Sequence, residues 1–456
     1  MAFVKTVHHI LKNQRGSIAI MLVLTAVALV TPFVVNFSFD TQINKMKVNN
    51  IEDRFKAQLT AESGLKFAMA RLRLYKEAYN FLQDNKDAKG AVKQELLDTI
   101  WNFPFIYPIP EMKSMNAIQK GAIQDFQKQT FLQGGLQLTI KNISNRINLN
   151  MLRISLIQEA IKEAQKENKS DDDDDDDDDD SNQKDKEFNA ENQLVKMLTE
   201  AIETESQNDE IFNSKYSNLE INRLINELKF YISDPNSVED AAGGDENFQS
   251  ADLKAKRAPL ASFSEVYGLP EWPDEIINLI KREFTVHGAL MIDLNKMTDK
   301  LLRILIPDIT PEDITEFFEY KNDPEDPKYF NSLDDFKKYI VSIASIMDES
   351  SFDERFQKYL AQGLQFGPTP TLFKIESVAA VERATYTLNA YVVIPAQPKP
   401  RIPKKAPENA ENGTVQTPPP PPPPPSDTTG GEADKKKKEE QKTLLLEPRI
   451  VEINVS

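Results

Sequence analysis

Few residues in this chain of 456 amino acids are suited to catalysis. It has no cysteine, which excludes thiol chemistry, and its three histidines are His8, His9 and His287. His8 and His9 lie in a short basic leader, so a serine–histidine–aspartate arrangement would have to use His287. No GxSxG, HExxH, P-loop or GxGxxG-type element occurs. We interpret His287, which precedes Gly288 at an expected turn, as structural and predict no enzymatic activity.

The dominant feature of the sequence is an apolar run that follows the leader. From Ser17 to Phe39, 23 residues carry no charge. A spanning helix needs about 20 residues, because each one rises ~1.5 Å through a ~30 Å hydrocarbon core. Backbone polar groups in lipid must be satisfied internally, so the run must be helical. Basic residues precede it and Asp40 follows it, which predicts a single pass with the N-terminus in the cytoplasm.

The boundary between leader and apolar run resembles a prepilin-type signal. Gly16 stands directly before the run, whose apolar core is longer than the ~7–15 residues of a cleaved secretory signal. Nor is Asn36-Phe37-Ser38 a small-x-small cleavage site. In the type IV pilin-like family a prepilin peptidase cuts after this glycine. The resemblance therefore implies cleavage between Gly16 and Ser17 and methylation of Ser17. An ordinary uncleaved signal anchor is the alternative.

One position in the run narrows the resemblance. Most family members carry glutamate at the fifth mature position, which is Met21 here when counted from Ser17. A carboxylate inside the bilayer is costly and is kept for a purpose. In pilin-like fibres that purpose is pairing with the N-terminal amine of the next subunit. A subunit at the tip has no neighbour ahead of it. The missing glutamate thus resembles the K-type minor pseudopilin of the type II secretion system, which caps the pseudopilus.

Further stretches resemble the K-type family in the same order along the chain. They are Ile147-Asn148-Leu149-Asn150, Tyr231-Ile232-Ser233-Asp234, Gly244-Asp245-Glu246-Asn247-Phe248 and Thr310-Pro311-Glu312. We expect the side chains of Asn148 and Asn150 to hydrogen-bond the backbone of a turn. The chain departs from the family at Ser144-Asn145-Arg146, where an acidic turn is expected, and at Ser233, where aspartate is expected.

The family binds calcium near the second and third of these stretches. Calcium takes six to eight oxygen ligands from carboxylates and carbonyls on a compliant backbone. The resemblance therefore implies a possible structural calcium site. Its candidate ligands are Asp234, Glu239, Asp240, Asp245 and Glu246. A solvated acidic loop without metal is the alternative.

The expected fold class is α+β: a long N-terminal helix with a pilin-like antiparallel sheet, interrupted by an inserted all-α domain. Apolar residues recur at three- and four-residue steps over 40–83, which predicts that the helix continues and packs its outer half on a globular domain. Gly64 would weaken that helix by roughly 1 kcal/mol relative to alanine, which indicates close packing on a sheet. Alternating patterns predict strands at 136–143, 372–379, 384–393 and 449–455.

Composition and pattern divide the chain into successive segments. They are the leader (1–16), the transmembrane part of the helix (17–39), the periplasmic helix half with the first part of the pilin-like domain (40–151), a helix-prone insertion (152–216), the inserted α domain (217–347), pilin-like strands (370–394), a linker (395–445) and a final strand (446–456). Ten consecutive aspartates at 171–180 bury nothing and predict a disordered loop. Eight consecutive prolines at 418–425 predict a polyproline II linker.

Charge argues against nucleic acid as a partner. The aspartate run supplies ten of the 17 net negative charges, and no basic stripe occurs. The paired helices around 301–320 are similar to helix-hairpin-helix modules. Their hairpin, 307–313, is acidic and would repel phosphate.

The resemblance implies an inner-membrane subunit of a Gram-negative bacterium whose bulk is periplasmic. It would join I-, J- and H-type minor pseudopilins at the pseudopilus tip, nucleating and capping assembly for protein export across the outer membrane. Its partners would also include prepilin peptidase and the membrane. The alternatives are a tip or assembly subunit of a type IV pilus, or a signal-anchored periplasmic enzyme.

Overall fold

The computed structural model describes most of the chain between residues 15 and 455. The described residues are 15–85, 92, 94–110, 115–130, 132–153, 190–234, 244–288, 291–306, 309–324, 328–343, 347–361, 364–398 and 443–455. The leader up to residue 14, the aspartate run and the proline run lie outside them.

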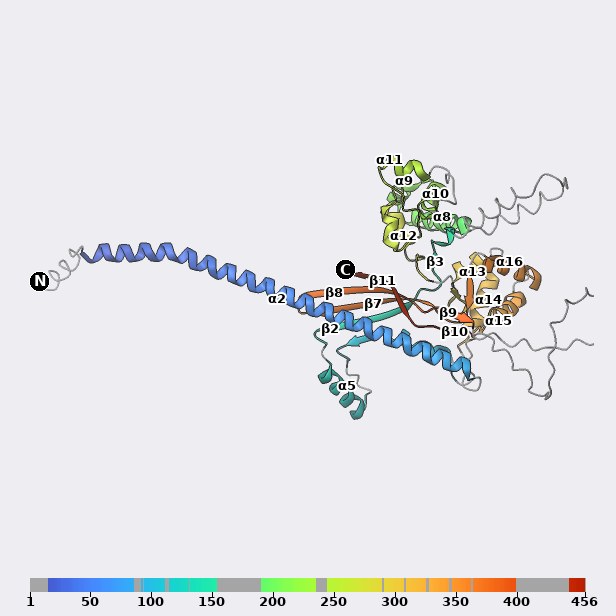
Figure 1. The fold of residues 1–456 in the computed structure, drawn as a ribbon, viewed down its shortest axis with the longest axis horizontal. Helices are drawn as coiled ribbons and strands as arrows, with labels where there is room; N and C mark the ends of the chain where they lie inside the picture. The colour runs from blue at the N-terminus through green and yellow to red at the C-terminus, as the bar shows by residue number, and fades with distance from the viewer. Residues whose placement is uncertain are drawn as a thin grey trace, which may run out of the picture.

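A single helix organises the fold. α2 (Arg15–Asp84) is 70 residues long, and its N-terminal half projects away from the remainder of the molecule (Figure 1). From Ala57 onward it buries one stripe at three- and four-residue steps, which includes Ala61, Leu65, Ala68 and Leu72. The predicted long helix is confirmed, because apolar side chains at this spacing share the face that a sheet can cover.

The C-terminal half of α2 packs on a five-stranded antiparallel sheet with strand order β1-β2-β7-β8-β11. The strands are β1 (Phe105–Tyr107), β2 (Gly135–Asn142), β7 (Leu372–Val381), β8 (Ala384–Val393) and β11 (Arg449–Val455). All four predicted strands are confirmed, and the last one joins the same sheet as the edge neighbour of β8. The α+β fold class is therefore correct.

Several elements beside the sheet were not predicted from the sequence. α4 (Gln94–Asn102) buries Trp101 against the core, and α5 (Ala117–Gln129) extends away from it. A small pair, β9 (Ala396–Pro398) and β10 (Thr443–Leu445), lies next to α2, where the side chain of Asn80 hydrogen-bonds both backbone groups of Leu445 at 2.8 Å.

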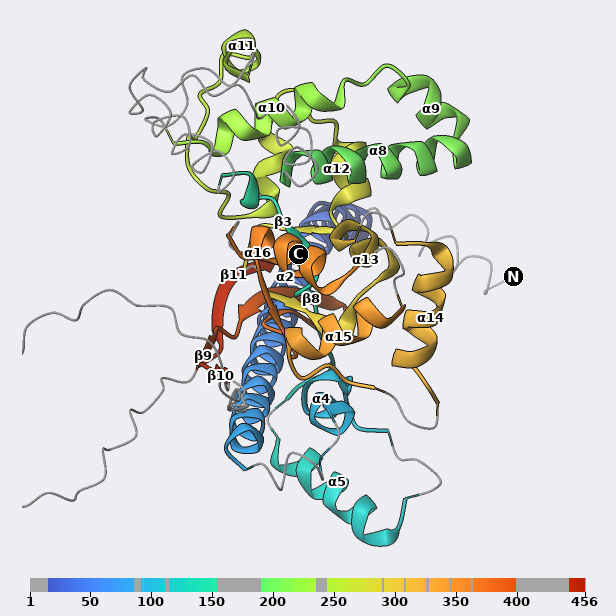
Figure 2. The same cartoon turned by 90° about the vertical axis from the view of Figure 1, so that its right-hand side faces the viewer.

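The segment between β2 and β7 forms two helical clusters, each with its own core. The first helical cluster contains α8 (Ala190–Asn208), α9 (Glu210–Tyr216), α10 (Ile221–Ile232), α11 (Gly244–Ser250), η2 (Phe263–Gly268) and α12 (Asp274–Ile280). The second contains η3 (Leu294–Lys296), α13 (Asp299–Leu305), α14 (Pro311–Lys321), α15 (Leu333–Ile343) and α16 (Glu349–Ala361). Figure 2 shows the first helical cluster on the side of the sheet away from α5.

The two cores differ from the single α domain expected over 217–347. Residues 190–216 share the first core, and α16 extends the second core to residue 361. Short parallel pairs tie each cluster to the chain near the sheet: β3 (Ile147–Asn148) with β4 (Phe284–Thr285), and β5 (Met291–Asp293) with β6 (Gln365–Gly367). Such long-range pairing leaves no local sequence signal, so the division was not visible in the periodicity.

Helix α2 approaches the sheet most closely at Gly64. A Cβ atom there would lie 2.3 Å from Ser377 Oγ and 2.9 Å from Leu136 Cδ1. Ser377 Oγ in turn donates a hydrogen bond of 2.8 Å to the backbone oxygen of Ala61. The predicted close packing at Gly64 is confirmed, and it holds helix and sheet together through both contact and a buried hydrogen bond.

We expect Gly64→Ala to destabilise the full-length protein by about 1–2 kcal/mol, although alanine favours a helix. The added methyl displaces the Ser377 hydroxyl from its acceptor and pushes on Leu136. Thermal unfolding in detergent measures the effect. Gly121→Ala in α5 is the matched control, because nothing lies within 4 Å of a Cβ there, and it should be neutral or stabilising. Equal stability of the Gly64→Ala variant and the unmodified protein would show that the close approach is not a constraint.

Candidate functional site

The N-terminal half of α2 is an apolar surface that nothing else in the described chain covers. Met21 is 71% exposed and Phe37 is 75% exposed. Among the described residues α2 is the one helix long and apolar enough to cross a membrane. Gly16 and Ser17 are its second and third residues, and cleavage between them stays a prediction.

A groove continues this surface where α2 meets α5. Its volume is about 570 Å³. Its walls are mainly apolar, and Phe67 and Phe126 remain 43% exposed on them. The α2–α5 groove is lined by Lys56, Leu59, Thr60, Glu62, Ser63, Lys66, Phe67, Phe105, Phe126, Thr130, Leu132, Gln133 and Leu136.

Helix α5 contributes Phe126 to this groove, and none of the residues of α5 is buried. Asn116 caps it in a capping box with Gln119, yet Ile118 is 83% exposed. A helix of 13 residues is marginal in water unless an apolar face is packed. The α2–α5 groove therefore has the character of a surface that accepts a partner.

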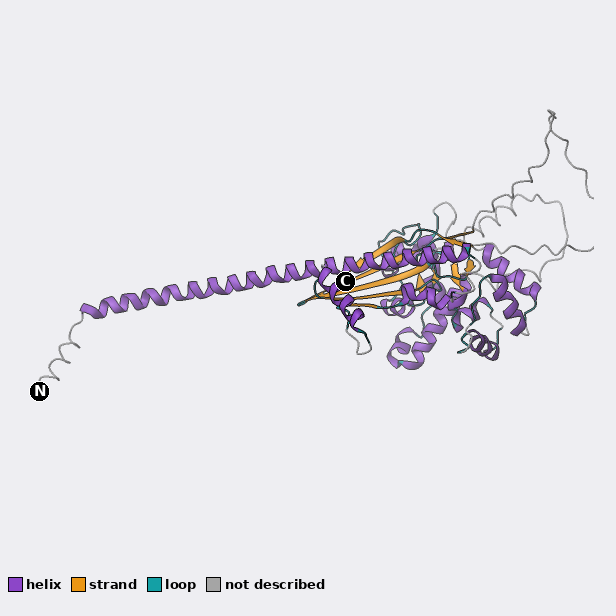
Figure 3. Ribbon diagram, turned by 90° about the horizontal axis from the view of Figure 1, so that it is seen from below, coloured by secondary structure: helices purple, strands orange, loops and turns teal. Residues whose placement is uncertain are grey.

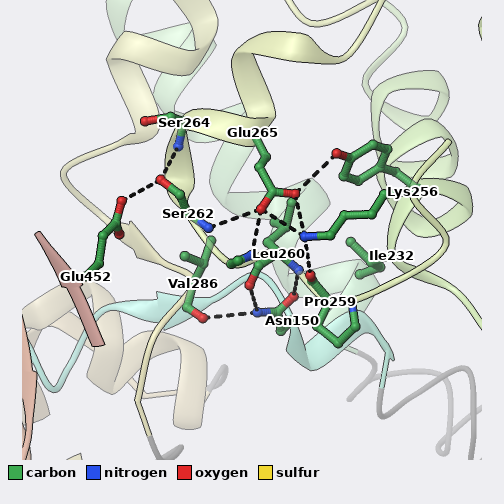
Figure 4. Close-up of polar contacts among 12 residues, drawn as sticks. Asn150, Ile232, Lys256, Pro259, Leu260, Ser262, Ser264, Glu265, Val286 and Glu452 are labelled. Atoms are coloured by element: carbon green, nitrogen blue, oxygen red, sulfur yellow. Dashed lines mark hydrogen bonds and ion pairs between the residues drawn. The ribbon is translucent and has the colours of Figure 1, made fainter. Parts of the chain in front are cut away.

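A polar network joins the first helical cluster to the chain that leaves the sheet (Figure 4). Asn150 Nδ2 donates to the backbone oxygens of Leu260 and Val286, both at 3.0 Å, and its Oδ1 accepts from the backbone N–H of Leu260 at 2.8 Å. Asn148 Oδ1 accepts from the backbone N–H of Asn150 at 2.9 Å. The predicted bonding of both asparagines to turn backbone is confirmed.

Glu265 is the second centre of the network. It accepts hydrogen bonds from the backbone N–H of Ala261, from Lys256 Nζ and from the hydroxyl of Tyr231. Each of its oxygens is satisfied, so the carboxylate is structural and is not poised to exchange a proton. Glu265 also completes a capping box with Ser262, the residue that caps the N-terminus of η2.

Glu452 connects this network to the edge strand of the sheet. It accepts from Ser262 Oγ at 2.5 Å and contacts His287 Nε2. A β-bulge between Ile450 and Glu452 places Glu452 opposite Tyr391. Burial raises the pKa of Glu452, but the hydrogen bonds from Ser262, His287 and Asn454 outweigh it and hold that pKa below its ordinary value. His287 thus serves as a structural partner of Glu452, in agreement with its interpretation from the sequence.

The acidic loop proposed for calcium is only partly described. Asp234 pairs with Arg153 at 3.3 Å, and Glu246 is exposed on α11. Glu239 and Asp240 lie outside the described residues, as does the side chain of Asp245. The described residues contain no group of three or more acidic, histidine or cysteine side chains that could hold a metal. The carboxylates of this loop that are described do not form a calcium site, and calcium binding stays a prediction.

A buried carboxylate that sequence reasoning missed lies near this loop. Glu227 on α10 is fully buried and accepts from the backbone N–H of Glu271 at 3.2 Å and from Asn247 Nδ2 at 3.4 Å. Burial raises the pKa of Glu227 to about 7, against the smaller opposing effect of these hydrogen bonds. The only sequence signal was a charged residue among the apolar positions of an amphipathic helix.

These elements define an α+β protein whose N-terminal helix has the length and apolar character of a membrane anchor. No family model and no curated protein matches the sequence. Among solved structures, the chain is similar to a chain of "The Crystal Structure of the GspK-GspI-GspJ complex from enterotoxigenic Escherichia coli Type 2 Secretion System". The TM-score is 0.39 and the identity 14%, over 75% of this chain and 94% of that one.

Glu227 predicts a pH dependence of stability. Its folded pKa of about 7 lies above its unfolded value, so the folded state holds the proton more tightly. Its contribution is favourable at low pH and is lost as pH rises from about 4.5 to about 7, by up to roughly 3 kcal/mol. Glu227→Gln should flatten the profile of thermal stability in this window. Glu210→Gln, which removes an exposed carboxylate on α9, should leave the profile unchanged. Parallel profiles for the unmodified protein and Glu227→Gln would contradict the assignment.

Proposed function

We propose that this chain is a minor pseudopilin of the K type, placed at the tip of a type II secretion pseudopilus. The observation that carries the proposal is one continuous helix with two different halves. Its first half is exposed and apolar, and its second half is part of the core of an antiparallel sheet. Such a helix can stay in a membrane or in a bundle of like helices while it holds a folded head outside.

The shape of the head supports a position at the end of a fibre. Both helical clusters are inserted between β2 and β7 and lie off the axis of α2 (Figure 3). A second subunit stacked along the same axis would meet this overhanging mass. The overhang favours the tip, and with it a role in nucleating and capping assembly by contact alone, without catalysis.

The partner-binding surface in this proposal is the exposed, apolar N-terminal half of α2 together with the α2–α5 groove. The occupant we propose is the amphipathic part of the N-terminal helix of a neighbouring minor pseudopilin. The groove is continuous with the exposed half of α2, and its mainly apolar lining also includes Lys56, Glu62 and Lys66. The first candidates are I- and J-type subunits, the kinds that accompany GspK in the similar solved complex, followed by an H-type subunit.

The proposed location follows from the helix and the leader. The N-terminus would be cytoplasmic, α2 would cross the inner membrane, and the head would be periplasmic. Prepilin peptidase would cut between Gly16 and Ser17. Calcium bound near 234–246 would belong to this proposal only if residues 239, 240 and 245 complete a ligand set.

The first test is the mass of the mature N-terminus. We expect the protein purified from its native membrane to begin at a methylated Ser17, because the peptidase recognises Gly16 at the cytoplasmic edge of the helix. Gly16→Leu should leave the leader attached, as seen by intact-protein mass spectrometry. A native protein that begins at Met1 or downstream of Phe39 would rule out the pseudopilin proposal and favour a plain anchor or a secretory signal.

The second test is co-purification with candidate partners. Phe67→Ser and Phe126→Ser each remove an aromatic wall of the groove, so each should weaken binding of I- or J-type pseudopilins roughly ten- to a hundredfold, as expected for about 1.5–3 kcal/mol of apolar burial. Phe81→Ser is the matched control, since Phe81 is an exposed aromatic residue of α2 outside the groove. Thermal stability is measured in parallel because Phe67 also contacts Phe105 at 4.9 Å between ring centroids. Selective recovery of type IV pilus subunits would favour the pilus alternative.

A further inference from the structure

Three polar side chains gather on the face of the sheet opposite α2. Lys374 on β7 stands directly between Lys141 on β2 and Tyr391 on β8 in the strand register. Its chain neighbour Ile375 faces α2 in the core, so Lys374 points to the other face. Arg146 follows β2 in a turn, where its backbone N–H donates to the backbone oxygen of Ile143 at 3.2 Å.

The polar ends of these side chains have no partner within the described chain. Neither the guanidinium of Arg146, the ammonium of Lys374 nor the hydroxyl of Tyr391 makes a hydrogen bond or an ion pair with a described residue. The nearby acids are engaged elsewhere. Glu283 lies 3.7 Å from Lys300, and Glu376 lies 3.9 Å from Lys141. Glu452 is held by Ser262 and His287.

Burial makes this arrangement costly. It lowers the pKa of Arg146, against weaker opposing effects of Tyr391 and Glu283. Burial also lowers the pKa of Lys374. The negative charge of Glu376 raises that pKa, and the neighbouring positive charges lower it further: Arg146, Lys141 and Lys281. Two half-buried cations beside each other repel, and an anion bound between them would relieve that repulsion.

Arg146 also has free space beside it. It lines a cavity of about 40 Å³ between the sheet and the two helical clusters. Other polar groups on the cavity wall are already satisfied: Ser144 Oγ accepts from two backbone N–H groups, and Asn148 donates to the backbone oxygen of His287. Thr285 accepts from the backbone N–H of His287. Arg146 is thus the unpaired polar group of this wall among the described residues.

We propose that Arg146, Lys374 and Tyr391 form a binding site for a doubly charged oxyanion such as a phosphate group. A guanidinium offers two parallel N–H donors to an oxyanion, lysine adds a point charge, and the phenol adds a neutral donor. Two cations match the charge of a dianion better than that of a single carboxylate. Lys281 and Glu283, which follow α12, lie near these side chains, so a bound anion would link the sheet to the first helical cluster. The proposal is independent of the assembly role.

The test uses the full-length protein in detergent, with inorganic phosphate as the probe at constant ionic strength. Isothermal titration should show saturable binding to the unmodified protein. Arg146→Gln and Lys374→Gln should each weaken it about tenfold or more, the effect of one lost charge-assisted hydrogen bond. Lys66→Gln removes an equal charge on the exposed face of α2 and should leave binding unchanged. Equal binding by all four proteins, or no saturable binding by the unmodified protein, would overturn the proposal.

A stability measurement guards against misfolded variants. In phosphate-free buffer, Lys374→Met should raise the Tm, because it removes an unpaired, partly buried charge. Phosphate and sulfate stabilise most proteins non-specifically. The informative quantity is therefore the Tm rise that the anion causes in the unmodified protein minus the rise that it causes in Lys374→Met. We expect that extra rise with phosphate and sulfate, and less with acetate. An identical rise in both proteins would contradict the site.

Discussion

The close approach of α2 to the sheet at Gly64 is the constraint on which the fold depends. A single helix has to be apolar on all sides in its first half and apolar on one side in its second half. The second half can meet the sheet closely only where a side chain is missing, which is what Gly64 provides. Ser377 fills that space with a hydroxyl that also bonds the helix backbone at Ala61. The described sheet and helical clusters are positioned on α2 through this contact.

The helical clusters add mass to the head without disturbing that core. Both are inserted between β2 and β7, strands that pair directly with each other. Because β2 and β7 are antiparallel neighbours, the long insertion leaves the sheet and returns to it at the same end of these two strands. Asn150, Glu265 and Glu452 then hold the first helical cluster against the turn after β2 and the edge strand. The network is largely satisfied internally, which suits a fixed orientation of the head and not a reacting centre.

Periodicity made the long helix and four of the five sheet strands predictable, because each segment carries its own apolar pattern. Gly64 was also interpretable, since a glycine inside a helix needs a packing reason.

Strand β1 was missed because it is three residues long and its register is set by β2. The two helical cores were missed because their separation depends on pairs such as Ile147 with Phe284, which are far apart in the chain. The partner of His287 could not be predicted either, because Glu452 lies 165 residues away. Of the candidate calcium ligands, only Asp234 and Glu246 have described side chains, and neither belongs to a group of three that could hold a metal among the described residues. The cluster of Arg146, Lys374 and Tyr391 depends on strand register, so no local motif announces it.

The position of β11 in the chain has a consequence for biogenesis. This strand is translated after every element that it joins, and it carries Glu452, which links the sheet edge to Ser262 and His287. Until β11 has been synthesised, the sheet therefore lacks its edge strand and β8 is unpaired on that side. A polypeptide that lacks β11 would present an unpaired β8 edge to proteases and to other chains.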